Sequence, residues 1–247
     1  MNYRKRQKGD IYFITLFLGL FLYLLLTFIY IFSALKAVSI VDGSLLASAF
    51  DENNPYYGEI LSMVQMMFNI PLIGFFIYVL RTDFQEDWKK FKTEFKKNIS
   101  YILIGIIACY TLTAVVAMIY ELLEITGTAD NQEIINQALF GKGKIPMIIS
   151  VVIFAPFVEE ILFRKLLFGT IEEKFKMPPV VAIIVSTLVF SLIHVSSGDN
   201  LIYIFQYLPL AFVITYSYYK SGRNIFVPIG IHFLNNLISV LAVYFLL

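Results

Sequence analysis

The stretch that decides the fold is MIISVVIFAPFVEEILFRKLLF, residues 147–168, an apolar run with two adjacent glutamates near its centre. A helix of about 20 mainly apolar residues is long enough to cross the hydrocarbon core of a bilayer. Ionisable side chains are costly at that depth, so Glu159 and Glu160 predict a functional site that faces other helices or a water-filled cavity. Two later apolar runs each add one histidine, His194 and His232.

The composition of the whole chain is that of a polytopic membrane protein. Of its 247 residues, 59% are hydrophobic and 15% are charged, against about 25% charged residues in an ordinary soluble domain. We therefore predict an all-α integral membrane protein of about seven transmembrane helices with no separate soluble domain. The content of Phe, Ile, Tyr and Lys favours a multi-pass protein of a bacterial plasma membrane. The predicted spans are residues 11–35, 60–80, 101–120, 147–168, 180–196, 201–219 and 225–247.

The basic residues predict the direction of these spans. With the N-terminus in the cytoplasm, 16 of the 19 Lys and Arg residues lie on the cytoplasmic side. Cytoplasmic loops of membrane proteins carry an excess of these residues, so the distribution predicts that the N-terminus is inside and the C-terminus outside. The basic segments concerned are residues 4–8, 81–97, 164–176 and 220–223.

The second of these segments, residues 81–97, combines basic and aromatic side chains. Its lysines alternate at near-helical spacing with Phe84, Trp88, Phe91 and Phe95. This pattern predicts a short amphipathic helix on the anionic inner leaflet of the membrane. Basic and aromatic residues also favour nucleic-acid binding, but between two predicted spans we expect contact with the lipid bilayer and no nucleic acid.

Within the central run, the spacing EE-x-x-x-R predicts different roles for the two glutamates. Adjacent residues lie about 100° apart around a helix, so Glu159 and Glu160 cannot share one partner equally. Glu160 and Arg164 are four residues apart and lie on one face. We therefore expect Arg164 to pair with Glu160 and to fix the helix, which leaves Glu159 for chemistry. The alternative is that both carboxylates form structural ion pairs between helices.

The two histidines lie in patterns that repeat this one-turn spacing. Phe190 precedes His194 by one helical turn, and His232 precedes Asn236 by the same interval. An intramembrane histidine can also serve only to hydrogen-bond a neighbouring helix. Taken together, however, a carboxylate, two imidazoles and an amide supply a base for water and donors for an oxyanion. These are the minimum groups for hydrolysis of an acyl bond.

The residues alone leave the nucleophile and any cofactor open. Water activated by a carboxylate is the most economical nucleophile. Ser191 precedes His194 by three residues, but an intrahelical hydroxyl more often bonds a carbonyl one turn back. The zinc signature His-Glu-x-x-His is absent. Glu159, His194 and His232 from separate helices would still suit a divalent metal such as zinc, with a position left for water.

Three motifs in this order, EE-x-x-x-R at 159–164, F-x-x-x-H at 190–194 and H-x-x-x-N at 232–236, resemble those of the CPBP family. That family unites type II CAAX prenyl endopeptidases with bacteriocin-processing and Abi-type membrane proteins. The resemblance covers about the last hundred residues. It divides the chain into residues 1–145, with three N-terminal spans and the basic loop, and residues 146–247, a catalytic core of four spans.

The resemblance implies an intramembrane endopeptidase that cleaves a membrane-associated peptide or protein near the cytoplasmic face. By position, Glu159 would activate water with the help of His194, while His232 and Asn236 would stabilise the oxyanion. Family members have been described both as metalloproteases and as metal-independent glutamic peptidases. The implied catalytic residues are Glu159, Glu160, His194, His232 and Asn236, and the residues that organise the site are Arg164 and Phe190.

Simple parallel helices would not bring these residues together. At 1.5 Å per residue, Glu159 lies about 14 Å from the cytoplasmic end of its run, whereas His194 lies about 22 Å beyond Pro179. We therefore expect the fourth span to continue as a tilted helix past Phe168. We also expect the fifth span to begin below the membrane surface, at Pro178 and Pro179.

Two other functions fit the same residues. In a non-catalytic membrane regulator or bacteriocin immunity protein, the motifs would serve as polar contacts between helices. In a proton-coupled transporter, the carboxylates and histidines would form a proton relay. The lack of a repeat between the two halves, and the concentration of polar groups in the last four spans, count against a transporter.

Overall fold

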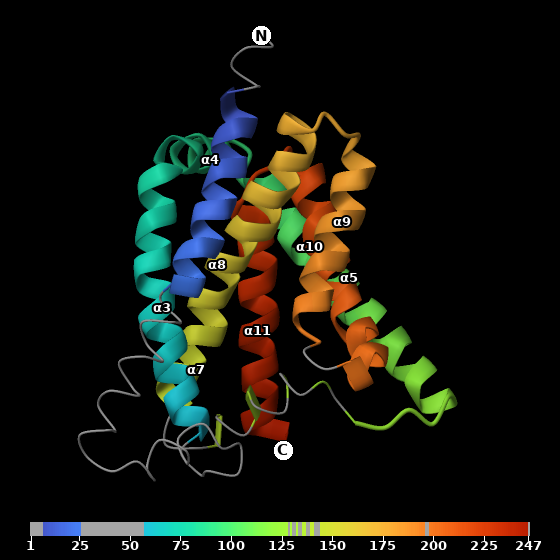
Figure 1. Ribbon diagram of the computed structural model, residues 1–247. Coiled ribbons are helices and arrows are strands. Elements are labelled where there is room, and N and C mark those ends of the chain that lie inside the picture. Colours follow the sequence, from blue (N-terminus) through green and yellow to red (C-terminus); the bar gives the residue numbers. More distant parts are fainter. Residues whose placement is uncertain are drawn as a thin grey trace, which may run out of the picture.

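The computed structural model of the protein describes residues 7–25, 57–127, 129, 132, 135–136, 139–140, 144–195 and 198–246. These residues form a bundle of helices without a strand among them (Figure 1), in agreement with the predicted all-α fold. The elements in order are helix Gln7–Leu25, α3 (Tyr57–Val79), α4 (Arg81–Thr93), α5 (Phe95–Leu122), α7 (Lys144–Ile149), η1 (Ser150–Phe154), α8 (Ala155–Glu160), η2 (Ile161–Phe168), η3 (Thr170–Lys174), α9 (Pro179–Ile193), η4 (Gly198–Tyr203), α10 (Ile204–Lys220) and α11 (Phe226–Leu246).

The described helices confirm a polytopic membrane protein. A sixth candidate span, besides the five below, is the pair Met66–Val79 and Arg81–Thr93, which bends by 82°. Helix α9 is apolar but has only 15 residues. The number of seven spans stays a prediction, and residues 26–35 of the first predicted span lie outside the described residues. Among the described residues, five helices are long and apolar enough to span a membrane: Gln7–Leu25, Phe95–Leu122, Lys144–Lys174, Leu201–Lys220 and Phe226–Phe245.

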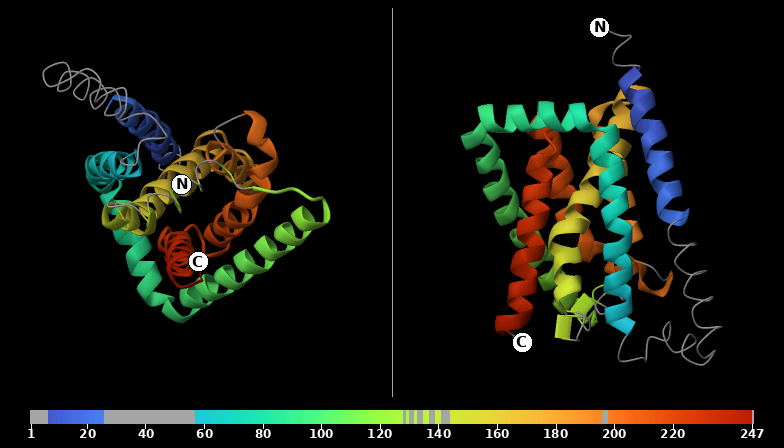
Figure 2. Two further views of the ribbon diagram at one scale, coloured as in Figure 1. Left: turned by 90° about the horizontal axis from the view of Figure 1, so that it is seen from below. Right: turned by 90° about the vertical axis from the view of Figure 1, so that its left-hand side faces the viewer.

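The helix Gln7–Leu25 begins and α11 ends at opposite ends of the bundle (Figures 1 and 2). Helix α4 crosses the end at which the helix Gln7–Leu25 begins, as the right-hand view of Figure 2 shows. Lys8 reaches Asp83 of α4 there, at 2.7 Å. The predicted cytoplasmic segments at the N-terminus and in α4 therefore share one end of the molecule. The side of the membrane that this end meets stays a prediction.

The predicted amphipathic helix is present, but its aromatic residues contact the bundle as well as the surface. Helix α4 ends at Thr93, and Phe95 already belongs to α5. The Trp88 ring stacks on Phe91, with centroids 5.8 Å apart, and meets Phe226 of α11 at 5.2 Å. The Trp88 side chain is about half exposed. Only part of this face is thus available to a lipid surface.

The central element is the helix Lys144–Lys174, which carries both glutamates. Its α-helical turn α8 lies between two π-helical stretches, η1 and η2. Pro156, which has no N–H to donate, falls near the start of α8, where the hydrogen-bond pattern changes. Departures from α-helical hydrogen bonding inside a helix are frequent at functional sites.

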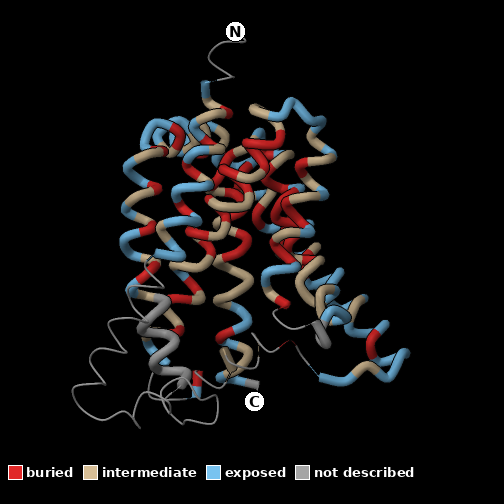
Figure 3. The backbone as a smooth tube through the Cα atoms, viewed as in Figure 1, coloured by how far each residue is buried: buried red, intermediate tan, exposed pale blue. Residues whose placement is uncertain are grey.

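Close packing fixes α11 against α5. A Cβ atom on Gly105 of α5 would lie 2.5 Å from the Ile231 Cδ1 atom of α11, so a larger residue there would require the Ile231 side chain to shift. Ile231 is fully buried and precedes His232 in the chain. Buried positions are concentrated in the half of the bundle nearer to α4 (Figure 3).

Candidate active site

Glu160 forms the ion pair that the sequence spacing predicts. Arg164 Nη1 donates to Glu160 Oε1 at 3.1 Å, and Arg164 Nε lies 3.1 Å from Oε2. Both side chains are 0% exposed. Arg164 also donates to the carbonyl of Ala211 at 3.2 Å and lies 4.4 Å from the centre of the Phe190 ring. The arginine therefore joins the glutamate helix to both α9 and α10.

Glu159 faces a different direction and makes looser contacts. Its Oε2 atom is 3.7 Å from His194 Nε2 and 4.0 Å from His232 Nε2. Both distances exceed those of a normal hydrogen bond. Oε2 has no hydrogen-bond partner among the described residues, although it is buried. A polar contact of this length suits a bridging water molecule.

His194 is held at the end of α9, one turn after Phe190. Its Nδ1 atom lies 2.7 Å from the Phe190 carbonyl oxygen. A carbonyl can only accept, so Nδ1 carries the proton and Nε2 faces Glu159. The imidazole also contacts the Phe190 ring, with centroids 4.5 Å apart and planes inclined by 30°, and the Tyr207 ring of α10, with centroids 4.9 Å apart and planes inclined by 35°.

His232 makes a contact that the motif spacing does not predict. Its Nδ1 atom lies 2.8 Å from Glu160 Oε1, and its side chain is only 4% exposed. Glu160 is already paired with Arg164, so its carboxylate accepts and His232 Nδ1 donates. Glu160 consequently has two partners, and His232 Nε2 faces Glu159.

Asn236 lies one helical turn after His232, and its side chain hydrogen-bonds a backbone carbonyl of the glutamate helix. Its Nδ2 atom donates to the Val151 carbonyl in η1 at 2.9 Å, which fastens α11 to the glutamate helix. One amide hydrogen is used in this way, and the second remains for another acceptor. Asn235 donates to Asn236 Oδ1 at 3.2 Å. Its contact is thus with its neighbour and not with Glu159.

The helix bounds explain how the motifs meet at one depth. The glutamate helix continues past Phe168 to Lys174, and α9 begins at Pro179, as the spacing predicts. Glu159 lies fifteen residues before Lys174, and His194 lies fifteen residues after Pro179. The interval in α9 corresponds to about 22 Å of α-helix, whereas most of the interval in the glutamate helix is π-helical. The two side chains lie at the same level, with Glu159 Oε2 3.7 Å from His194 Nε2.

The structure also bears on the two alternatives to carboxylate-activated water, which are a serine nucleophile and a metal-bound water. Ser191 is fully buried and donates to the Thr187 carbonyl at 3.0 Å, so its hydroxyl bonds its own helix. Among the described residues, no group of three His, Cys, Asp or Glu side chains is arranged to hold a metal ion. The 3.7 and 4.0 Å separations between Glu159 and the imidazole nitrogens exceed the ~3.4 Å between two ligands of a tetrahedral zinc ion.

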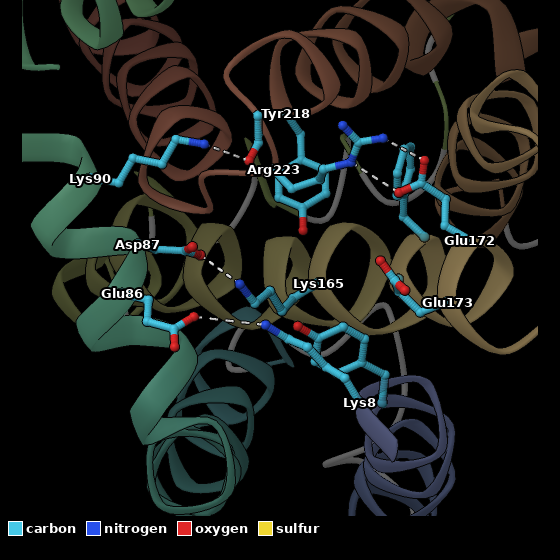
Figure 4. Close-up of a pocket in the computed structure, with 13 residues that line it drawn as sticks. Lys8, Glu86, Asp87, Lys90, Lys165, Glu172, Glu173, Tyr218 and Arg223 are labelled. Atoms are coloured by element: carbon cyan, nitrogen blue, oxygen red, sulfur yellow. Dashed lines mark hydrogen bonds and ion pairs between the residues drawn. The ribbon is translucent and has the colours of Figure 1, made fainter. Parts of the chain in front are cut away.

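A second polar cluster lines a pocket of about 290 Å³ at the end of the bundle that α4 crosses (Figure 4). Lys165, the neighbour of Arg164, is only 3% exposed and lies 2.6 Å from Asp87 of α4. On another wall, Arg223 binds both carboxylate oxygens of Glu172. These hydrogen bonds are the largest cause that raises the pKa of Arg223 above its ordinary value. The cluster joins the glutamate helix to its neighbours.

Removing the buried cation of this cluster should destabilise the protein. We expect Lys165→Met to lower the free energy of unfolding by about 1–3 kcal/mol, because Asp87 would lose the cation that it binds in a largely buried position. Lys8→Met, at the exposed rim, is the matched control and should cost about 0–1 kcal/mol. Thermal unfolding in detergent compares them. Equal effects of the two changes would contradict the structural role given to Lys165.

Two contacts of the site lie outside the three motifs. Tyr207 reaches His194 and Ala211 reaches Arg164, and both residues belong to α10. The sequence places these two residues on one face of a helix, because they are four residues apart, but it gives no other indication that they contact the site. An aromatic residue and an alanine in an apolar span have no feature that distinguishes them from packing residues.

Comparison with known proteins finds similarity in the region of the chain that contains the three motifs. The sequence model of the family described as type II CAAX prenyl endopeptidase Rce1-like matches residues 141–238, which include all three motifs. The membrane-embedded CAAX protease MroQ of Staphylococcus aureus is 29% identical over 150 residues, 60% of this chain and 60% of that protein. No solved structure matches.

Two further relatives are less informative by name. An uncharacterized protein of Mycoplasma capricolum is 29% identical over 203 residues, 78% of this chain and 58% of that protein. The UPF0177 protein YxdF of Lactococcus lactis is 38% identical over 79 residues, 32% of this chain and 39% of that protein. The chain spans 60% or less of the length of these three relatives.

Proposed function

We propose, on the premise that this chain belongs to the CPBP family of intramembrane peptidases, that it is an intramembrane endopeptidase in which Glu159 activates water. The observation that carries the proposal is the unequal use of the two glutamates. Glu160 is occupied by Arg164 and His232, whereas Glu159 Oε2 faces two imidazole nitrogens without a hydrogen bond among the described residues. The substrate is a membrane-associated peptide or protein.

Water binds between Glu159 and His194 in this mechanism. His194 Nδ1 donates to a carbonyl, so the neutral ring presents a lone pair at Nε2. A water molecule can then donate one hydrogen to Glu159 and the other to His194 Nε2, which lie 3.7 Å apart. Its oxygen keeps a lone pair for attack on the scissile carbonyl carbon. Glu159 takes the proton as the new C–O bond forms.

His232 and Asn236 receive the negative charge that develops on the carbonyl oxygen. His232 Nδ1 donates to Glu160. For Nε2 to donate to an oxyanion as well, the ring must carry both protons, and the carboxylate of Glu160 stabilises that cation. The second amide hydrogen of Asn236 supplies another donor. Preorganised donors of this kind, in a site largely shielded from water, act where charge develops in the transition state.

Collapse of the tetrahedral intermediate completes the reaction. The carbonyl re-forms, the C–N bond breaks, and the proton held by Glu159 passes to the leaving nitrogen. The products are a carboxylic acid and an amine, so one water is consumed for each bond cleaved. During attack, His194 Nε2 accepts the hydrogen that stays on the attacking oxygen and so keeps that oxygen in position.

We expect Asn236→Ala to lower kcat by about 10²- to 10³-fold, as loss of one oxyanion donor does in other hydrolases. Asn236 also holds Val151, so some loss of stability should accompany the change. Asn98→Ala is the matched control, because the buried Asn98 Nδ2 atom also donates to a backbone carbonyl, that of Phe91, and Asn98 belongs to none of the three motifs. A variant with unchanged kcat and reduced stability would show that Asn236 acts only on structure.

The activity is tested with purified protein in detergent on a pool of membrane-associated bacterial peptides. Mass spectrometry identifies new peptide ends, and a chelator is added in a parallel sample. We expect hydrolysis that the chelator leaves intact. Loss of hydrolysis with chelator would instead indicate a metal held by Glu159, His194 and His232. Prenylated and unprenylated peptides in the pool distinguish the two kinds of substrate.

A further inference from the structure

We propose that Tyr207 is a positioning residue, whose ring fixes the imidazole of His194 in the orientation that the reaction needs. The proposal deepens the function given above and rests on it. Tyr207 lies on α10 and belongs to none of the three motifs. Its ring centroid is 4.9 Å from that of His194, with the planes inclined by 35°.

His194 needs support from outside its own helix because of where it stands. Helix α9 ends at Ile193, and His194 is its C-cap residue. The helix therefore restrains it on one side only. Its Nδ1 hydrogen bond to Phe190 sets the direction of one ring edge, at 2.7 Å. From its own helix the imidazole is thus held by this hydrogen bond and by the Phe190 ring, 4.5 Å away. The Tyr207 ring adds the contact from a second helix, α10, and limits the remaining tilt.

The register of α10 explains why Tyr207 is at the right place. Arg164 donates to the carbonyl of Ala211, one helical turn after Tyr207. Residues four apart lie on the same face of a helix. The contact that orients Glu160 through Arg164 thus also sets the height of the ring against His194. Helix α10 therefore contacts both Arg164, which pairs with Glu160, and His194, which faces Glu159.

The position of the imidazole has a direct chemical effect. His194 Nε2 is 3.7 Å from Glu159 Oε2, a distance that suits one bridging water. A tilt of the ring would move Nε2 away from the water that it holds. Displacement of a reacting group by about 1 Å can cost up to a hundredfold in rate. Because the observed contact is between the two rings, we expect the aromatic face of Tyr207 to supply this restraint.

The histidine content of the chain permits a test that needs no substrate. The sequence contains two histidines, and both are in the site. In protein labelled with ¹⁵N-histidine, every imidazole signal therefore comes from His194 or His232, and His194→Gln assigns them. We expect the wild type and Tyr207→Phe to show His194 as a single tautomer protonated at Nδ1. In Tyr207→Leu its signals should shift and broaden, while those of His232 stay in place.

Activity gives the second readout, on a peptide that the wild-type protein cleaves. We expect Tyr207→Leu to lower kcat about tenfold with KM unchanged, and Tyr207→Phe to stay within about twofold of the wild type. Tyr216→Leu is the matched control, on the same helix but with a side chain that stacks on Phe212. It should affect neither readout.

The outcomes separate this proposal from the proposed function. Unchanged His194 signals in Tyr207→Leu would overturn the positioning role. Equal losses in Tyr207→Phe and Tyr207→Leu would overturn it too, since they would assign the effect to the hydroxyl. If the His194 signals respond as expected but Glu159→Gln cleaves peptides normally, the positioning of His194 stands and the peptidase mechanism fails.

Discussion

Peptide hydrolysis should fall by about 10²- to 10⁴-fold when Glu159 is replaced by glutamine, the range expected for loss of a general base. Glutamine keeps the size of the side chain but cannot accept the proton of the attacking water. The fold should persist, because Glu159 Oε2 makes no hydrogen bond within the described residues. Mass spectrometry of the peptide pool measures the first effect, and thermal unfolding in detergent measures the second.

Glu86→Gln is the matched control for this variant. Glu86 is a carboxylate of the same length on α4, but its side chain is 75% exposed and remote in sequence from the motifs. Hydrolysis by the control should equal that of the wild type. Wild-type hydrolysis by Glu159→Gln would contradict the glutamate mechanism. A cellular effect that survives in Glu159→Gln would favour the regulator or immunity function.

The local pairing within the site follows from the sequence because helix geometry fixes it. Glu160 and Arg164 are one turn apart, so a helix at this position must bring them together. The same argument relates Phe190 to His194. The expected continuation of the glutamate helix past Phe168 and the expected start of α9 at the Pro178–Pro179 pair also agree with the structure. The catalytic roles of these residues stay predictions.

Contacts between helices could not be derived in the same way. The sequence gives no register between α11 and the glutamate helix, so the hydrogen bond from His232 to Glu160 was not expected. That bond changes the role of Glu160 from the partner of one arginine to the acceptor for two cationic or donor groups. Hydrogen bonds to backbone carbonyls, such as those of Val151 and Ala211, also cannot be predicted from the sequence, because every residue has a backbone carbonyl.

Replacing Arg164 should have the largest effect on stability. We expect Arg164→Met to lower the free energy of unfolding by about 3–5 kcal/mol, because it leaves Glu160 charged and fully buried with only His232 as a partner among the described residues. The loss comes from the uncompensated carboxylate more than from the absent contacts of arginine. Thermal and denaturant-induced unfolding in detergent measure this change.

The double variant Glu160→Gln/Arg164→Met separates these two causes. Removing both members of a buried ion pair costs less than removing one, since no uncompensated charge remains. The amide oxygen introduced by Glu160→Gln would still accept the hydrogen bond from His232 Nδ1. We therefore expect the double variant to be more stable than Arg164→Met alone. If it is equally unstable, the contacts of Arg164 with Ala211 and Phe190, and not its charge, hold the helices together.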